Sequence, residues 1–285
     1  MNAELAAFRH ILAHPGQFGM QVLRAFRNHQ GLLLAGAVAY YTLLSIVPLF
    51  SLLLVGLSHV VDEAELIAMT RGLLELLVAS QADALIAQLR TFLEHRAVIG
   101  GFGFLVMLFF SSLAFSVLEN CMSVIFFHRA GVRHRHFLVS AALPYLFIAL
   151  LGFGVLAVTV IGTMVQATDF HLGEPASVGL YLLGVVGLML MLTAIYLVIP
   201  VGKISFKHAL VGGVTAGLLW EIVRHIMVWY FRTLSMVNVI YGSFATTVLA
   251  LLSLELASII LLLGAQVIAE FERLIARMVA ERKTA

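Results

Sequence analysis

Long runs of apolar residues, separated by short polar segments, dominate the chain. Six of these runs carry few charges and are long enough for a helix to cross a bilayer, which takes about 20 residues. We predict spans near residues 31–57, 98–127, 137–166, 177–200, 206–230 and 243–269. The pattern therefore predicts an all-α integral membrane protein with six transmembrane helices. They form a single membrane domain, residues 1–285, without room for a separate soluble catalytic domain.

The segment between the first two predicted spans, residues 58–97, has a different pattern. Acidic residues are interleaved with leucines that recur at helical spacing. Ser80 followed by Asp83 resembles an N-cap with an acidic residue in the first turn, which would start a second helix. Arg71 and Glu75 lie in the middle of the first half and argue against a seventh span. We therefore expect an amphipathic helical hairpin on the outer face.

Ahead of the first predicted span, Phe18, Val22 and Phe26 recur every four residues, with two arginines beside them. This pattern is typical of a helix that lies in the headgroup region of a membrane. Residues 1–30 are therefore expected to form a cytoplasmic interfacial segment. The alternative is a cytoplasmic helix that packs on other loops.

Composition and charge placement agree with a bilayer as the solvent. Of 285 residues, 62% are hydrophobic and 11% are charged, whereas roughly a quarter of the residues in soluble domains are charged. Twelve of the 17 Lys and Arg residues fall in the two terminal tails and in the loops after the second and fourth predicted spans. Because cytoplasmic loops are enriched in Lys and Arg, both termini are expected in the cytoplasm. An even number of spans agrees with this orientation.

Sequence motifs for catalysis are absent. The lone Cys121 excludes an internal disulfide and argues against a thiolate metal cluster. The chain has no Gly-rich phosphate loop, no nucleophile elbow and no basic-aromatic surface for nucleic acid. We therefore expect no enzyme activity, no cofactor, no metal and no nucleic-acid partner.

The loop after the second predicted span is strongly basic, with Arg129, Arg133 and Arg135 interleaved with histidines. Two of these histidines have the spacing of metal ligands, but no Asp lies in the cytoplasmic segments to complete a hydrolase site. A basic loop beside the inner leaflet fits the anionic headgroups of lipids. We expect these arginines to contact lipid.

Charged side chains inside predicted spans are the first candidates for function, because each costs several kcal/mol near the bilayer centre. Glu221 and Arg224 are three residues apart and can pair on one helical face. Glu255 lies near the middle of an antiparallel span, so the three could meet at similar depth. They could bind a coupling proton or an anionic group, or form a structural ion pair. Glu119 and Asn120 lie toward the cytoplasmic end of the second span, where a carboxylate can reach Arg129 or water, which favours a structural role over a binding role.

The first predicted span carries a second group of polar residues. Tyr40, Tyr41, Thr42 and Ser45 place four hydroxyls within two turns, and Pro48 should kink the helix because it cannot donate to the preceding turn. Interrupted helices often line substrate sites in transporters. They are also common as simple kinks that neighbouring side chains fill.

Small residues form a stripe on the fifth predicted span, at Ala209, Gly213 and Gly217. Such a stripe lets another helix approach closely. It predicts tight packing and does not discriminate between functions.

Three stretches resemble the YihY/BrkB family of bacterial inner-membrane proteins, once labelled ribonuclease BN. They are residues 39–49, the Glu119-Asn120 pair, and the region from Leu219-Trp220-Glu221 through Tyr241-Gly242-Ser243 to residues 263–266. The resemblance covers most of the chain and implies a bacterial inner-membrane location. It implies a role in transport or in envelope integrity, without an established activity. One departure is that Leu252 and Glu255 stand where the family tends to have Trp and Tyr.

The leading hypothesis is a transporter or permease for a small anionic or amphiphilic solute, with a polar cavity between the first, fifth and sixth spans. One alternative is a non-catalytic envelope factor that binds lipid or a partner protein, and another is lipid translocation between leaflets. Membrane lipids and an unknown solute are the expected partners, and a homo-oligomer is left open. Pro48 has no mid-span equivalent in the fourth span, where Pro200 is terminal, which argues against an inverted repeat.

Overall fold

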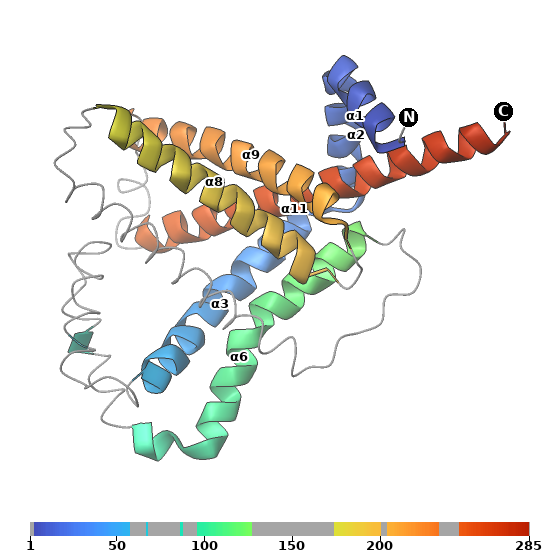
Figure 1. Cartoon of the computed structure of the whole chain (residues 1–285). Coiled ribbons are helices and arrows are strands. Elements are labelled where there is room, and N and C mark those ends of the chain that lie inside the picture. The colour runs from blue at the N-terminus through green and yellow to red at the C-terminus, as the bar shows by residue number, and fades with distance from the viewer. Residues whose placement is uncertain are drawn as a thin grey trace. The chain divides into compact units, whose positions relative to one another are not determined.

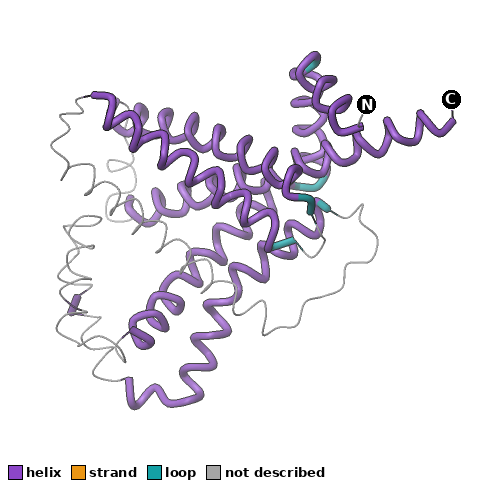
Figure 2. Tube along the Cα trace, in the orientation of Figure 1, coloured by secondary structure: helices purple, strands orange, loops and turns teal. Residues whose placement is uncertain are grey.

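The computed structural model describes residues 3–57, 67, 86–87, 96–126, 174–200, 204–233 and 245–284. Its elements are α1 (Ala3–Ala13), α2 (Pro15–Asn28), α3 (Gly31–Leu57), α6 (Arg96–Ile125), α8 (Glu174–Val198), α9 (Phe206–Thr233) and α11 (Ala245–Thr284) (Figure 1). All of these elements are helices, and these residues include no strand (Figure 2). The predicted helical class is confirmed for this part of the chain.

Four described helices are long and apolar enough to cross a membrane. Their apolar stretches are Leu105–Ile125, Tyr181–Val198, Phe206–Tyr230 and Val248–Glu281. They coincide with the second, fourth, fifth and sixth predicted spans. The start of α3 is a shorter apolar stretch, Gly31–Ile46. The third predicted span and almost all of the predicted outer hairpin lie outside the described residues, so the total of six spans stays a prediction.

The chain divides into two compact units. One comprises Met1–Tyr40 with Phe115–Ala285, and the other comprises Tyr41–Ala114. Helices α3 and α6 contribute to both units. The expected single membrane domain is not tested by this division and stays a prediction.

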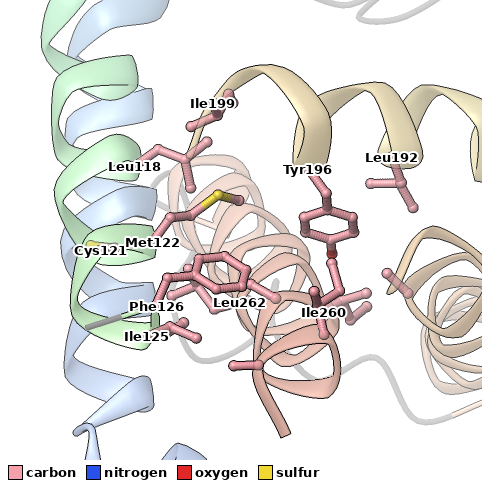
Figure 3. Close-up of a cluster of buried hydrophobic side chains, with 14 of the residues drawn as sticks. Leu118, Cys121, Met122, Ile125, Phe126, Leu192, Tyr196, Ile199, Ile260 and Leu262 are labelled. Carbon is pink, nitrogen blue, oxygen red and sulfur yellow. The ribbon is translucent and has the colours of Figure 1, made fainter. Parts of the chain in front are cut away.

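The core of the larger unit lies where α6, α8 and α11 meet. Figure 3 shows Leu118 and Met122 of α6 pointing toward Leu262 of α11, while the ring of Tyr196 comes in from α8. Tyr196 is fully buried, and its hydroxyl donates to the Leu261 carbonyl oxygen over 2.7 Å. This bond satisfies a polar group that would be costly to leave unpaired in an apolar interior.

Helix α9 packs against two neighbours through two stripes of small residues. On one stripe, a Cβ added to Gly213 would lie 2.8 Å from the Met189 carbonyl oxygen of α8, and one added to Gly217 would lie 2.5 Å from Met189 Cγ. On the other stripe, a Cβ added to Gly212 would lie 3.0 Å from the Gly264 carbonyl oxygen of α11. The close approach predicted for Gly213 and Gly217 is therefore confirmed, with α8 as the partner.

Helix α11 is 40 residues long. At about 1.5 Å per residue it extends roughly 60 Å, twice the thickness of a bilayer core of about 30 Å. Its residues 264–271 are all buried. Helices α1, α2 and α9 pack against α11.

A tight turn joins α2 to α3. Gln30 has a φ of 54°, and the Phe26 ring covers Gly31 so closely that an added Cβ would collide with it. Val22 and Phe26 are buried. The apolar stripe that predicted a lipid-facing anchor is thus turned toward protein, because it packs onto the turn and onto the neighbouring helices.

Candidate functional site

Packing between α8 and α9 brings Tyr181 to the predicted ion pair. The contacts of Gly213 and Gly217 with Met189 set the register of the two helices. Continued toward the end of α9, this register places Tyr181 level with residues 221–224. Because Gly213, Gly217 and Glu221 follow one another at four-residue spacing, the carboxylate lies on the same α8-facing stripe.

Tyr181, Glu221 and Arg224 form one hydrogen-bonded cluster. The Tyr181 hydroxyl donates to Glu221 Oε2 over 2.6 Å. Arg224 Nη2 donates to the same oxygen over 2.6 Å and to the Tyr181 hydroxyl over 2.9 Å. Arg224 Nε lies 3.2 Å from Glu221 Oε2, and the guanidinium carbon lies 5.5 Å from the centre of the Tyr181 ring. The pairing of Glu221 with Arg224 is therefore confirmed.

The cluster leaves hydrogen-bonding capacity unused. A guanidinium has five N–H donors and a carboxylate two acceptor oxygens. Within the described part of the chain, Arg224 Nη1 donates no hydrogen bond and Glu221 Oε1 accepts none. The Arg224 side chain is 41% exposed, whereas that of Glu221 is 17% exposed. The positive group is thus the more accessible partner of the pair.

His225 lies beside the cluster, on an exposed face of α9. Its Nδ1 is 2.7 Å from the Glu221 carbonyl oxygen and 3.9 Å from Glu221 Oε2. A carbonyl oxygen only accepts hydrogen bonds, so Nδ1 carries the proton in this contact. The exposed ring therefore does not compete with Arg224 for the carboxylate.

Glu255 does not join this cluster. The close approach of Gly212 and Ala216 to Gly264 places Glu255 level with Glu221 along the helix axes. No hydrogen bond or ion pair links Glu255 to another described residue. Glu221 faces α8, whereas α11 packs on the neighbouring face of α9. The three side chains lie at similar levels along the helices, but only Glu221 and Arg224 meet.

Ser45 is occupied in a contact between two helices of the smaller unit. It is buried, and its hydroxyl donates to the Phe110 carbonyl oxygen over 2.8 Å and accepts from the Ala114 amide over 3.2 Å. These two groups of α6 are four residues apart and would otherwise close one helical turn. The hydroxyl is inserted into the hydrogen-bond ladder of α6, which is a structural role.

The remaining polar candidates of α3 have varied environments. Tyr40 is exposed, whereas Tyr41, Thr42 and Pro48 are half-buried. Helix α3 continues through Pro48 to Leu57. The proline therefore does not end the helix, although it removes one backbone donor.

Candidates around the second span are only partly described. The Glu119 side chain is buried near the C-terminal end of α6, while Asn120 is exposed. Arg129, Arg133 and Arg135 lie outside the described residues, so their predicted contact with lipid stays a prediction. No group of three or more His, Cys, Asp or Glu side chains in the described ranges could hold a metal ion.

A second polar network lies where α2, α9 and α11 meet, and sequence reasoning missed it. His29 Nδ1 is 3.0 Å from Oε1 of the buried Gln266, whose amide nitrogen donates to Glu270 over 3.3 Å. Arg273 pairs with Glu270 over 2.7 Å. His208 of α9 lies 2.9 Å from Glu272 in the same part of α11. In the sequence, the i,i+3 spacing of Glu270 and Arg273 was the feature that could have predicted this network.

Tyr181 was also missed, because a single tyrosine near the end of an apolar run is ordinary. Aromatic residues are enriched where membrane meets water, and this position fits that pattern. Only the register between α8 and α9 reveals that its hydroxyl reaches the ion pair.

Comparisons with known proteins agree with the membrane assignment. The family model described as "Virulence factor BrkB" matches residues 22–285. A UPF0761 membrane protein of Azotobacter vinelandii is 28% identical over 253 residues, which are 88% of this chain and 62% of that protein. One from Haemophilus influenzae is 24% identical over 253 residues, which are 87% of this chain and 93% of that protein.

The chain spans about three fifths of the length of the first curated relatives, such as the Chromohalobacter salexigens protein, of which it covers 62%. No solved structure matches this chain. The family match extends over nearly the whole chain, and the resemblance noted from the sequence motifs is confirmed. The chain belongs to the BrkB family of membrane proteins, also called YihY/BrkB.

Proposed function

We propose that this membrane protein is a transporter or permease that moves a small anionic or amphiphilic solute past Arg224. The observation that carries the proposal is the cluster of Tyr181, Glu221 and Arg224, in which a half-exposed guanidinium inside a span keeps unused donors on Nη1. A cation within a spanning helix is rare and often marks a function. A purely structural pair would have no need of an accessible edge.

Arg224 is suited to an anion because of its fixed geometry. The Glu221 carboxylate accepts from Nε and Nη2 of the guanidinium, and the Tyr181 hydroxyl accepts from Nη2. The two N–H donors of Nη1 are left for a charge-assisted hydrogen bond to an anionic oxygen, such as that of a carboxylate or phosphate. Because Tyr181 and Glu221 already hold the Arg224 side chain in place, less conformational entropy is lost when a ligand binds.

Charge balance supports a role for a proton. Glu221 and Arg224 neutralise each other, so an anion that binds Arg224 would bring one unpaired negative charge into the span. Uptake of a proton by Glu221, whose Oε1 accepts no hydrogen bond from the described residues, would remove that charge. Glu255 at the same depth is a second candidate for this proton.

The proposal includes a location and an orientation. The protein would lie in the bacterial inner membrane with six spans and both termini in the cytoplasm, as the placement of Lys and Arg favours. Tyr181 then lies toward the outer face, since α8 would run inward. The function is proposed as non-catalytic, with membrane lipids and the solute as partners.

The test begins with purified protein and a panel of anions that covers carboxylates, phosphates, sulfonates and fatty-acid anions. Thermal unfolding is compared for the wild type, Arg224→Gln, Arg224→Lys and the matched control Arg273→Gln, which also breaks an i,i+3 pair with a glutamate. At least one anion should raise the unfolding temperature of the wild type and of Arg273→Gln. It should not raise that of Arg224→Gln. Proteoliposomes then measure uptake of that anion.

If Arg224→Gln folds and responds to each anion as the wild type does, the cluster is a structural ion pair and the proposal is wrong. A different result would be a wild type that moves labelled phospholipid between leaflets but takes up no solute, with the lipid flux lost in Arg224→Gln. Lipid translocation would then replace solute transport as the function. The absence of both fluxes in a folded wild type would favour an envelope factor.

A further inference from the structure

Helix α1 presents an apolar stripe that no described part of the chain covers. Leu5, Phe8 and Leu12 are 63%, 50% and 67% exposed. Their i, i+3, i+7 spacing places them on one face of the helix. Ala7 is fully buried and lies on a different face. One face of the helix therefore packs on protein, and another exposes leucine and phenylalanine side chains. Such an apolar face is typical of a surface that contacts a membrane or another protein.

Packing on α11 and the turn at the end of α2 hold α1 near the residue at which the chain enters its first apolar stretch. Pro15 at the start of α2 ends α1, because proline cannot continue the preceding helix. Helices α1 and α2 both pack on α11 (Figure 1). The hydrogen bond between His29 and Gln266 ties the end of α2 to α11, and the tight turn at Gly31 joins α2 to the beginning of α3. Helix α1 is thus anchored near the boundary of the apolar spans.

Helices α1 and α2 carry three arginines and one acid, Glu4, so the net charge of the two helices that include the stripe is positive. Arg9 is exposed beside it on α1, and Arg24 and Arg27 are exposed on α2. The nearby acids of α11 are already paired, Glu270 with Arg273 and Glu272 with His208. Arginines beside an exposed apolar stripe are the composition of helices that lie in a membrane surface with anionic headgroups.

We propose that α1 lies in the membrane surface, with Leu5, Phe8 and Leu12 inserted among the lipids of the leaflet next to Gly31. Arginine side chains reach from such a depth to the headgroups. The lipid contact thus belongs to α1, not to Phe18, Val22 and Phe26, of which Val22 and Phe26 are buried in protein. The N-terminal pair acts as an interfacial clamp, with α1 on the lipid and α2 on α11.

The experiment places a fluorophore on α1 in the full-length protein in nanodiscs of phosphatidylethanolamine and phosphatidylglycerol. The single cysteine is removed as Cys121→Ala, and NBD is attached at Phe8→Cys or Leu12→Cys. The matched control is His10→Cys, which is exposed on the opposite face of the same helix. Quenching is measured with lipids spin-labelled near the headgroup and with iodide in the water.

We expect the probes at positions 8 and 12 to lose most of their fluorescence to spin-labelled lipid and little to iodide, with the reverse at position 10. Quenching of positions 8 and 12 by iodide would overturn the proposal, because the stripe would face water. Protection from both quenchers would also overturn it, since protein would then cover the stripe. If Phe8→Cys does not fold, Leu12→Cys gives the same reading. None of these outcomes depends on whether Arg224 binds an anion.

Discussion

At the scale of single residues, a polar side chain in a membrane span is defined by its partners. Arg224 has a carboxylate on its own helix and a tyrosine hydroxyl on the next, and it still keeps free donors among the described residues. The Ser45 hydroxyl donates to the Phe110 carbonyl oxygen of α6 and accepts from the Ala114 amide, so both of its roles are taken. The first residue can bind a ligand without losing its support, whereas the second cannot.

Ser45 provides a test of this distinction. Ser45→Ala removes the bridge between Phe110 and Ala114 and should lower the free energy of unfolding by about 1 kcal/mol, the net value of a typical hydrogen bond. Thr42→Val, one turn earlier and half-buried, should change it little. Thermal unfolding in one detergent measures both. A variant Ser45→Ala with wild-type stability and reduced solute flux would show that Ser45 belongs to the transport site after all.

At the scale of elements, α9 is the organising helix because small residues line two of its faces. Gly212 and Ala216 let α11 approach, and Gly213 and Gly217 let α8 approach. In lipid, helices associate through close packing, since the hydrophobic effect does not favour protein contact over lipid contact. The cluster of Tyr181, Glu221 and Arg224 extends the second stripe, so the packing that joins α8 to α9 also positions Tyr181.

Two glycine substitutions separate packing from helix propensity. Gly213→Ala would place a Cβ 2.8 Å from a carbonyl oxygen of α8 and should cost about 1–3 kcal/mol, as overpacking does. Gly187→Ala has nothing within 4 Å and should be neutral or stabilise by up to about 1 kcal/mol through helix propensity. Thermal unfolding of both variants checks the difference. Equal effects of the two would contradict the close contact between α8 and α9.

At the scale of the whole molecule, the orientation in the membrane remains to be measured. Single cysteines in a Cys121→Ala background, at Asp83→Cys and at Arg277→Cys, report the two sides. A membrane-impermeant maleimide should label Asp83→Cys in intact spheroplasts and Arg277→Cys only after permeabilisation, because the placement of Lys and Arg favours a cytoplasmic C-terminus. Labelling of Arg277→Cys in intact spheroplasts would reverse the proposed topology.

The sequence by itself determined the helical class, the apolar stretches of four described helices, the family and the pairing of Glu221 with Arg224. These follow from local properties of the chain, namely the mean hydropathy of successive segments and the fixed distance between side chains three residues apart on a helix. The small-residue stripe at Gly213 and Gly217 is local in the same sense, so its tight packing was predictable.

Only the tertiary structure decided which faces meet. It placed Tyr181 at the ion pair, kept Glu255 apart, committed Ser45 to α6 and turned Val22 and Phe26 toward protein. Each of these depends on the rotation and register of one helix against another. Close contacts such as that of Gly213 with Met189 set the register. Hydropathy carries no such information, because an apolar residue suits lipid and a protein interface equally well.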